Sequence, residues 1–416
     1  GNTYWNDIYW HNEEPRKYEG YCTDVWFGLT LNYIKNRTPE DKPFFIYLAT
    51  NCPHSPHWCD DKYAKPYIGK TPNETIARFF GQIANIDENM GRLLTSLDEN
   101  KLAENTILVY MTDNGTTLGH HVFNAGMRGH KTEPYEGGHR VPLFIRWPGG
   151  KLGEPRDIGT LAQMQDLLPT LIDWCSLEKP ENANFDGTSL SPLFKGQSSK
   201  LDDRIIVVEY ENPYRPAENK AVLWKKWRLV KGTELYNLED DPGQTSNVAA
   251  QHPGVMQKLQ EYYRQWQEQT LSDYAKERYI HLGNEQQNPM LLYSSDWEGS
   301  YADNLGNLLA GNQIGSWDVI VDQPGEYVFT LSRWHPASGL PLSATMNDWE
   351  GNPRGSLPIH FARLKTNEFD ETVETRQEQE SAKFSVSLPG GVNKIETWFL
   401  DKDKKPLCSA YYTQTE

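Results

Sequence analysis

The chain has 416 residues, more than one hydrophobic core usually supports, so two or three domains are expected. Hydrophobic residues make up 37% and aromatic residues 12% of the sequence, a composition that excludes general disorder. The 41 basic and 57 acidic residues give a net charge of −16, which excludes nucleic acid as a favoured partner, because phosphate binding needs a basic surface. A small anionic substrate stays compatible with this charge, since a few cations in a cleft can prevail locally.

Strand and helix patterns alternate over the first 210 residues. The pattern Thr71-Pro72-Asn73-Glu74 predicts a helix start, with Thr71 as the cap, and apolar residues recur at helical spacing to about Asn100. A shorter helix is expected at Leu167–Cys175. Four apolar runs predict buried strands of one layered α/β sheet, and the first lacks polar alternation, as central parallel strands do. These strands are expected at Pro43–Thr50, Thr106–Thr112, Leu143–Trp147 and Arg204–Glu209.

The pattern of predicted strands and helices changes after about residue 215. Leu223–Val230 and Thr233–Asn237 predict short antiparallel strands, and His252–Tyr279 carries a long polar helix. From about Gly283, short strand-like runs separated by Pro/Gly turns predict an all-β sandwich. Most of its tryptophans are expected in the core, although some could offer aromatic platforms for a sugar: Trp297, Trp317, Trp334, Trp349 and Trp398. The expected domains are therefore 1–215, 216–283 and 284–416.

The cysteines and the apolar runs limit two further interpretations. The five cysteines show neither a zinc-binding spacing nor a disulfide scaffold, so buried or free thiols are expected, with a bridge between Cys52 and Cys59 left open. The longest apolar run, Phe44–Ala49, is too short to cross a bilayer, so no membrane partner is expected.

Asp113-Asn114-Gly115 directly follows a predicted buried strand. In open α/β sheets, ligands bind beyond the carboxyl ends of the strands. A carboxylate and an amide oxygen there suit Ca²⁺ or Mg²⁺ rather than zinc. Asp-Asn-Gly is also ordinary turn chemistry, and taken alone the turn is the more probable interpretation.

Two further segments are rich in polar chemistry. Gly126–Pro142 carries five cationic or potentially cationic side chains, which would suit a sulfate or phosphate monoester, although a solvated loop explains them equally well. They are Arg128, His130, Lys131, His139 and Arg140. His54 stands between two prolines after the first predicted strand, where it could act as a general acid or anion ligand; alone, it would more often be an ordinary loop histidine.

These three segments share one predicted sheet edge, and together they resemble the later blocks of the formylglycine-dependent arylsulfatase family of the alkaline phosphatase superfamily. The resemblance covers roughly residues 1–280 in order and spacing, and the tail after 283 is similar to a β-domain appended to some bacterial sulfatases. The fold implied is an alkaline-phosphatase-like α/β sheet flanked by helices, with a small antiparallel C-terminal subdomain. The resembling stretches are Phe44–Pro56, Val109–Gly115, Arg128–Pro142 and Leu235–Pro242.

The resemblance implies roles for individual residues. Asp113 and Asn114 would supply part of a Ca²⁺ site that holds a sulfate oxygen. Lys131 would contact the sulfate and the leaving oxygen, and His54 would hydrogen-bond the leaving-group oxygen and protonate it. Glu136 and Arg140 are expected to shape the loop rather than to touch substrate.

The sequence also departs from the family pattern. The Cys/Ser-x-Pro-x-Arg motif that is converted to formylglycine is absent, as are the early Asp-Asp metal pair and the Gly-Lys-Trp-His-Leu-Gly segment. Trp5–Gly20 resembles the stretch that normally follows that last segment. We therefore expect an N-terminally truncated or split form, inactive alone, whose sheet an N-terminal fragment or second chain completes. Otherwise the strand at Thr106–Thr112 or its neighbours should be exposed.

The function implied is that of a periplasmic or extracellular sulfuric ester hydrolase acting on a sulfated carbohydrate. Two alternatives stay open: a phosphomonoester or phosphonate hydrolase of the same superfamily, and a non-catalytic, sulfatase-like carbohydrate-binding protein. The identity of the nucleophile separates the sulfatase from the phosphatase-type hydrolase. A Cys-x-Pro-x-Arg motif favours a sulfatase, whereas a threonine or plain serine favours a phosphatase.

Overall fold

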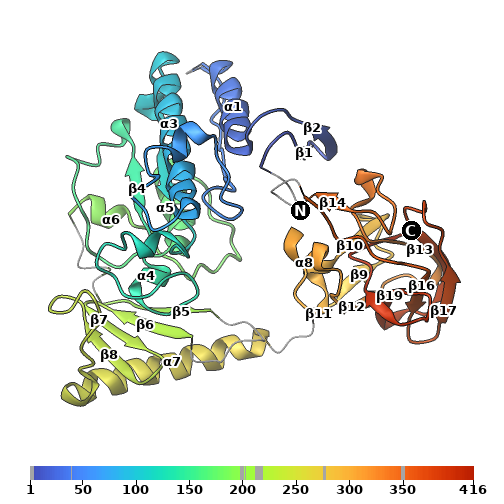
Figure 1. Cartoon of the computed structure of the whole chain (residues 1–416). Helices are drawn as coiled ribbons and strands as arrows, with labels where there is room; N and C mark the ends of the chain where they lie inside the picture. Colours follow the sequence, from blue (N-terminus) through green and yellow to red (C-terminus); the bar gives the residue numbers. More distant parts are fainter. Residues whose placement is uncertain are drawn as a thin grey trace. The chain divides into compact units, whose positions relative to one another are not determined.

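A computed structural model describes all residues except 1–3, 39, 197–200, 202, 211–218, 275–277 and 348–351. The chain forms two compact units, one of residues 21–273 and one of residues 1–20 with 274–416 (Figure 1). It is a mixed α/β structure with several sheets. The three-domain division at residues 215 and 283 stays a prediction.

Two helices organise the start of the first unit. Helices α1 (Cys22–Lys35) and α3 (Glu74–Glu99) pack side by side around a small apolar core that includes Phe27 and Leu97 (Figure 1). The expected cap at Thr71 is wrong. Asn73 caps α3 instead, because its side-chain oxygen accepts the Ile76 N–H at 3.0 Å while its backbone is extended.

The strands of this unit pair differently from the expected parallel sheet. Strand β3 (Leu108–Met111) pairs only with β4 (Leu143–Arg146) among the described strands, and the pairing is antiparallel. Residues 43–50 form no strand, which corrects the prediction at Pro43–Thr50. A strand requires a hydrogen-bonded neighbour, and the described residues provide none for this segment. Its apolar character is nevertheless used, since Phe44, Ile46 and Leu48 pack on the α1–α3 core.

Short elements fill the rest of the first unit. Helix α5 (Leu167–Cys175) has the predicted bounds. The other short helices are α2 (Asp61–Ala64), α4 (Glu136–His139) and α6 (Ser191–Phe194). Single 3₁₀ turns are η1 (Ala103–Asn105), η2 (Gly119–His121), η3 (Pro148–Gly150), η4 (Met164–Asp166) and η6 (Ala249–Gln251).

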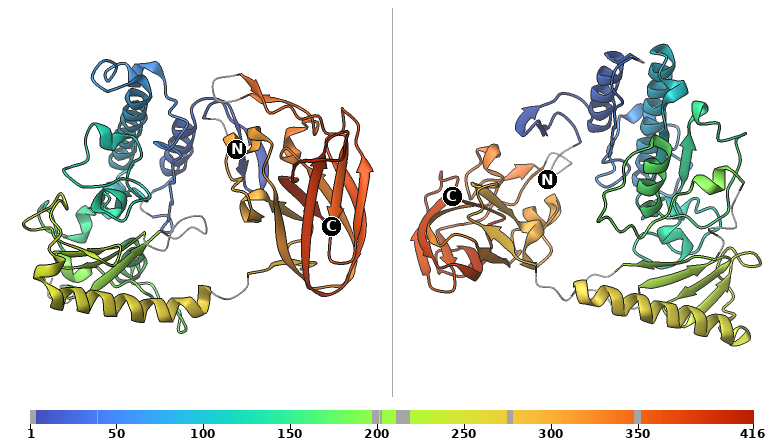
Figure 2. Two further views of the ribbon diagram at one scale, coloured as in Figure 1. Left: turned by 60° about the horizontal axis from the view of Figure 1, so that its bottom comes forward. Right: turned by 180° about the vertical axis from the view of Figure 1, so that it is seen from behind.

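A four-stranded antiparallel sheet with a helix along one face closes the first unit (Figures 1 and 2). Its strands follow chain order: β5 (Ile205–Glu209), β6 (Lys220–Trp224), β7 (Trp227–Val230) and β8 (Glu234–Asn237). Helix α7 (Pro253–Tyr274) packs on one face through Leu259 and Tyr263, while Tyr135 packs on the other. The run at 204–209 was expected in the α/β sheet. Its continuous apolar pattern has a different cause, because the antiparallel sheet that contains it is covered on both faces.

The second unit contains the predicted all-β sandwich. One sheet has the order β10 (Met290–Tyr293), β21 (Tyr412–Thr415), β13 (Gly325–Ser332), β18 (Ala382–Leu388). The other runs β11 (Glu298–Gly299), β12 (Gly315–Val321), β19 (Gly391–Leu400), β16 (Phe361–Lys365), β17 (Asp370–Glu374), with β9 (Ile280–Leu282) on β12 and β20 (Pro406–Cys408) on β19. The remaining elements are hairpins β1–β2 (Ile8–His11, Glu14–Lys17) and β14–β15 (Met346–Asn347, Pro353–Arg354), helix α8 (Leu305–Ala310) and 3₁₀ turns η7 (Ser294–Asp296) and η8 (Pro336–Ser338).

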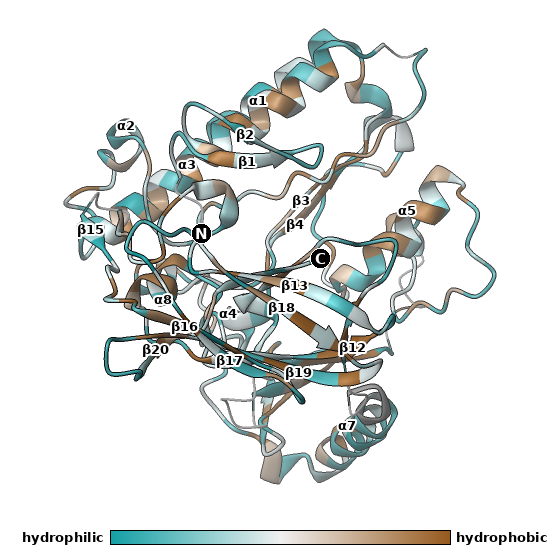
Figure 3. Cartoon of the chain, turned by 90° about the vertical axis from the view of Figure 1, so that its right-hand side faces the viewer, coloured by the Kyte–Doolittle hydropathy of each residue, from teal (hydrophilic) through white to brown (hydrophobic). Residues whose placement is uncertain are grey.

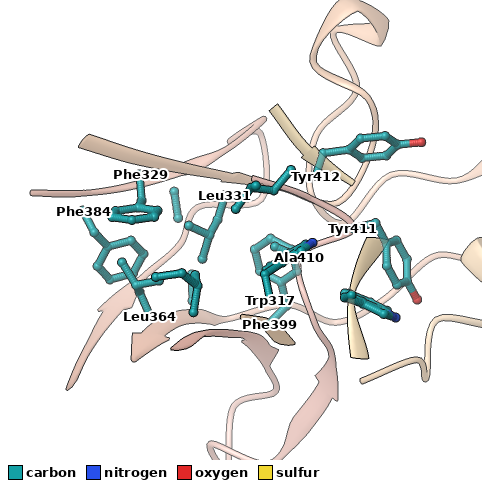
Figure 4. Packing of buried hydrophobic residues seen from close by; sticks show 14 of the residues in the cluster. Trp317, Phe329, Leu331, Leu364, Phe384, Phe399, Ala410, Tyr411 and Tyr412 are labelled. Atoms are coloured by element: carbon teal, nitrogen blue, oxygen red, sulfur yellow. The ribbon is translucent and has the colours of Figure 1, made fainter. Parts of the chain in front are cut away.

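The facing sides of the two sheets form one apolar core, part of which Figure 4 shows. Every second residue of β18 is buried, as a sandwich requires. Trp317 lies at full burial among Phe399 and Ala410, and Trp297 and Trp334 belong to the same core, so these three are not sugar platforms. Trp398 is half-buried under the Arg363 guanidinium, and Trp349 lies outside the described residues.

In the part of the chain that the structure describes, no helix combines the length and the apolar character needed to cross a membrane.

Candidate active site

Two backbone hydrogen bonds join the loop after β3 to the loop before β4. The Gly115 N–H donates to the Gly138 carbonyl, with 3.0 Å between nitrogen and oxygen, and the Lys131 N–H donates to the Thr116 carbonyl at 3.2 Å. Asp113 and Asn114 therefore lie beside the segment that carries Lys131. Asp113 and Asn114 precede Lys131 by 18 and 17 positions in the sequence, and the fold brings all three to one end of the β3–β4 pair.

Glycines make this close approach possible. A Cβ atom added to Gly115 would lie 1.9 Å from the Gly137 carbonyl oxygen, and one added to Gly138 would lie 1.9 Å from the Glu133 carbonyl oxygen. Real Cβ atoms do not approach oxygen so closely, so only glycine fits at either position. The Glu-Gly-Gly sequence is therefore a packing requirement of this loop.

Asp113 and Asn114 are hydrogen-bonded to each other. The Asp113 carboxylate accepts the Asn114 backbone N–H at 2.9 Å and the Asn114 side-chain amide at 2.6 Å. A carboxylate and an amide oxygen are the donors that a hard cation such as Ca²⁺ prefers, so their chemistry fits this ion. The described residues contain no group of three His, Cys, Asp or Glu side chains placed to hold a metal. Asp113 and Asn114 would thus supply only part of a coordination sphere, and their role as metal ligands stays a prediction.

The Lys131 ammonium has no carboxylate within ion-pair distance among the described residues. Its neighbours on both sides are engaged. The His130 ring nitrogen Nδ1 lies 2.9 Å from the Lys131 carbonyl oxygen, and the Glu133 carboxylate accepts the His130 backbone N–H at 3.2 Å. Within this loop, Lys131 is therefore the cation best suited to meet an anionic ligand.

The other predicted cations of Gly126–Pro142 mostly support the loop. The Arg128 guanidinium stacks on the Tyr135 ring at 3.9 Å and donates to the hydroxyls of Tyr135 and Tyr236, each at 2.9 Å. His139 is largely buried, with 12% of its side chain exposed, and burial lowers its pKa. Arg128 and His139 thus have partners within the fold, and anion binding by the five cations together stays a prediction.

A buried ion pair fixes the loop to the antiparallel sheet. Arg228 Nε on β7 donates to Glu136 Oε1 at 2.6 Å, and the Gln244 side-chain oxygen accepts the Glu136 backbone N–H at 2.8 Å. Arg140 Nη1 lies 3.6 Å from Glu136 Oε2. Glu136 and Arg140 thus shape the loop, in agreement with the expectation from the sequence.

His54 lies on the exposed loop that follows residues 43–50, where Gln82 of α3 holds the backbone in place. The buried Gln82 amide nitrogen lies 3.3 Å from the Pro56 carbonyl oxygen and 3.5 Å from that of His54. Its side-chain oxygen lies 3.1 Å from His57 Nδ1. Burial lowers the pKa of His57, so this imidazole is neutral at pH 7.

Phe79 of α3 links the His54 loop to the rest of the site. Its ring packs edge-on against His57, with 5.9 Å between centroids, and it abuts Gly119 in the turn that follows Asn114. The structure thus joins Asp113, Asn114 and Lys131 through hydrogen-bonded loops and places His54 on a separate loop of the same unit. Their roles toward a substrate stay predictions.

Three imidazole rings gather beside Lys131, and of these only His130 was expected from the sequence, as a potential cation. The His120 ring lies 3.9 Å from that of His121 and 4.6 Å from that of His130, between centroids. The buried His120 Nδ1 has no hydrogen-bond partner among the described residues, and burial with the two neighbouring rings lowers its pKa. No regular spacing in the sequence predicts this cluster. The segment with His120 and His121 and the segment with His130 meet only in the fold, where the Lys131 N–H donates to the Thr116 carbonyl.

Two protein families match parts of this chain. Residues 1–177 match the family model described as Sulfatase, and residues 130–272 match that of the N-sulphoglucosamine sulphohydrolase C-terminal region. Residues 1–177 thus match the sulfatase family, and this match agrees with the resemblance to sulfatases of the alkaline phosphatase superfamily found in the sequence.

Individual relatives extend the comparison. The chain is 30% identical over 196 residues to the uncharacterized sulfatase YdeN of Escherichia coli K12, covering 46% of this chain and 34% of that protein. It is 28% identical over 262 residues to an arylsulfatase of Clostridium perfringens, covering 53% and 52%. Among solved structures it resembles Ps i-CgsB in complex with k-i-k-neocarrahexaose, with a TM-score of 0.55 and 25% identity, covering 62% of this chain and 57% of that one. The chain spans between about a third and a half of the length of these curated relatives.

Proposed function

We propose that this chain is part of a sulfuric ester hydrolase that acts on a sulfated carbohydrate in the periplasm or outside the cell. One observation carries the proposal: the paired loops that bring Asp113, Asn114 and Lys131 to one end of β3–β4. Similarity to an N-acetylgalactosamine-6-O-sulfatase of Bacteroides thetaiotaomicron, 28% identical over 247 residues, supports a sugar substrate.

Each residue has a distinct task in this proposal. The Lys131 ammonium binds the sulfate group and offsets the charge that develops on the leaving oxygen. His54, when protonated, gives its proton to the departing alkoxide. Asp113 and Asn114 would hold Ca²⁺, which supplies further positive charge at a sulfate oxygen.

We propose further that the formylglycine nucleophile and the remaining Ca²⁺ ligands come from a polypeptide segment outside these 416 residues. An uncovered apolar face supports this. Phe45 and Tyr47 are 79% and 84% exposed, and Phe144 on β4 is 66% exposed with its ring 6.3 Å from that of Tyr110. The hydrophobic colouring of β3 and β4 is visible in Figure 3. Large aromatic side chains left this exposed are typical of surfaces that bind another molecule, and here we propose that a polypeptide segment covers them.

The test is ester hydrolysis, measured with and without Ca²⁺. The purified chain should not hydrolyse 4-nitrophenyl sulfate alone. Activity should appear after co-expression with a sulfatase segment that carries a formylglycine motif. In that complex, Lys131→Ala and His54→Ala should each lower kcat by about 100-fold or more. Lys151→Ala, at an exposed lysine of the same unit, is the matched control and should change little.

The outcomes separate the alternatives. Turnover by the chain alone would overturn the claim that the nucleophile lies elsewhere. Preference for phosphate or phosphonate esters would favour the phosphatase-type hydrolase. Binding of sulfated sugar without turnover by any combination would favour a non-catalytic carbohydrate-binding protein.

Calcium binding is tested separately. Titration with Ca²⁺ should give weak binding to the chain, because only two of the six to eight oxygen ligands are assigned here. Asp113→Ala should abolish that binding. Asp186→Ala, which removes an exposed carboxylate elsewhere in the unit, should leave it unchanged. Equal binding by both variants would exclude Asp113 as a ligand.

A further inference from the structure

Two buried cysteines from different elements lie beside one threonine hydroxyl. Cys22 is the first residue of α1, and Cys52 precedes His54 by two residues. They are only 1% and 5% exposed. The Thr23 hydroxyl oxygen lies 3.9 Å from the Cys22 sulfur and 3.1 Å from the Cys52 sulfur, so the two sulfur atoms share this neighbour.

The Cys52 sulfur is the centre of a small polar network. The Thr23 hydroxyl donates to it at 3.1 Å and also lies 3.9 Å from the Cys22 sulfur. The Tyr21 hydroxyl lies 2.8 Å from the same sulfur, and the Gln82 amide donates to it at 3.6 Å. The contact with Cys22, followed by the hydrogen bonds from Thr23 and Tyr21, lowers the pKa of the Cys52 thiol against the opposing effect of burial. The contact with Cys52 and burial raise the pKa of the Cys22 thiol. Cys52 therefore loses its proton more readily than Cys22 and is the sulfur that attacks first.

We propose that Cys22 and Cys52 form a reversible disulfide bond that ties helix α1 to the root of the His54 loop. The oxidant is a small-molecule disulfide. The Cys52 thiolate attacks one of its sulfur atoms, which forms a mixed disulfide and releases one thiol. The Cys22 thiol then gives up its proton, its sulfur attacks the Cys52 sulfur, and the second small thiolate leaves and takes up a proton. Two protein thiols thus lose two electrons and two protons, and one small disulfide becomes two thiols.

Cys59 is the competing partner, since it lies on the far side of the same loop. Its thiol donates instead to the Arg78 carbonyl at 3.6 Å, and burial raises its pKa to about 11. It also packs against Gly81 of α3, where a Cβ atom would lie 2.7 Å from its sulfur. Cys59 is therefore held as a thiol in the α3 interface, and Cys22 is the partner that the geometry favours.

The bond would act on the loop rather than on a reacting atom. In the reduced protein, Gln82 and the Tyr21 hydroxyl hold residues 54–58 through carbonyl oxygens. A covalent link from Cys52 to α1 removes the freedom of the loop to leave these partners. The oxidised protein should therefore unfold at a higher temperature, by roughly 5–10 °C for a loop of this length.

The experiment uses the full chain incubated with mixtures of reduced and oxidised glutathione. Free thiols are counted after denaturation, and alkylated digests are mapped by mass spectrometry. We expect two thiols to be lost together, with Cys22 and Cys52 in one linked peptide and the thermal midpoint raised. Cys175→Ser removes the exposed cysteine and should behave like the wild type, whereas Cys22→Ser should form no intramolecular bridge.

Two results would overturn the proposal: a peptide that links Cys52 to Cys59, or protein in which Cys22 and Cys52 stay reduced while Cys175 is glutathionylated. Because mapping is done on the wild-type chain, poor folding of Cys22→Ser does not affect this conclusion. The readout involves no ester hydrolysis, so the inference and the proposed function fail independently.

Discussion

Arg228 Nε lies 2.6 Å from Glu136 Oε1, with 7% and 2% of the two side chains exposed. The pair joins β7 to the loop that carries Lys131, across a distance of ninety-two positions in the sequence. A charge so deeply buried is tolerated only with a partner. The shape of the candidate active site therefore depends on the antiparallel sheet that follows it in the chain.

Glu136→Gln should destabilise the first unit by about 3–5 kcal/mol, because it leaves the Arg228 guanidinium buried without its counter-charge. Urea denaturation followed by tryptophan fluorescence measures this loss. Arg140→Gln is the matched control, since Arg140 also faces Glu136 but is 65% exposed, and it should cost about 1 kcal/mol or less. Similar losses for the two variants would show that the Arg228 pair is not the anchor.

Gly138→Ala should disrupt the loop pairing, because its Cβ would lie 1.9 Å from the Glu133 carbonyl oxygen. We expect a loss of more than about 2 kcal/mol, in the range of core overpacking. Gly91→Ala is the control: Gly91 lies within α3 with open space around its Cβ position, so alanine should stabilise by up to about 1 kcal/mol. If Gly138→Ala is neutral in denaturation, the close approach of the two loops is incorrect.

The sequence predicts many of the secondary-structure elements, but it does not predict how the strands pair. The positions of β3, β4, α5 and β8 and the sandwich follow from local apolar patterns. The strand expected at Leu223–Val230 is instead divided by a turn at residues 225–226 into β6 and β7. Pairing partners do not follow from such patterns, because a continuous apolar run looks the same in a parallel sheet, in β5 of an antiparallel sheet, and in residues 43–50, which form no strand. Asp113 and Lys131 were found through their motifs. Arg228, Gln82 and His120 were missed, since each acquires its role only from a partner distant in sequence.

Stability should fall as the pH drops from about 7 to 5. Burial holds the pKa of His139 below its ordinary value of 6.5, and nearby Arg228 lowers it further. The unfolded chain therefore takes up a proton that the native chain does not. The contribution of His139 to the free energy of unfolding is constant above pH 6.5. It declines as the pH falls from 6.5 toward the lowered pKa of His139 in the folded chain, by at most about 1.4 kcal/mol per pH unit for one proton. Burial acts in the same direction on the pKa of His57 and His120.

Replacing the buried imidazole isolates its share of this dependence. His139→Gln should flatten the decline of the free energy of unfolding between pH 7 and 5, whatever its effect at pH 7.5. Denaturation curves at half-unit pH intervals for the wild type and the variant measure the difference. Parallel pH profiles would mean that His139 titrates alike in the folded and unfolded chain.

The exposed apolar face predicts self-association when no other polypeptide covers it. Phe45 and Tyr47 are exposed, whereas the alternate residues Phe44, Ile46 and Leu48 pack on the α1–α3 core. Polar replacements of Phe45 and Tyr47 therefore leave that core unchanged. The double variant Phe45→Ser/Tyr47→Thr should bind less of a hydrophobic dye and stay monomeric at concentrations where the wild type associates, because two large exposed aromatic side chains are removed. Sedimentation velocity over a concentration series measures the association. Leu177→Ser, at a single exposed leucine after α5, is the control and should behave like the wild type. A wild-type chain that sediments as a monomer at every concentration, with no dye binding, would contradict an interface at this face and with it the proposal that another segment completes the sheet.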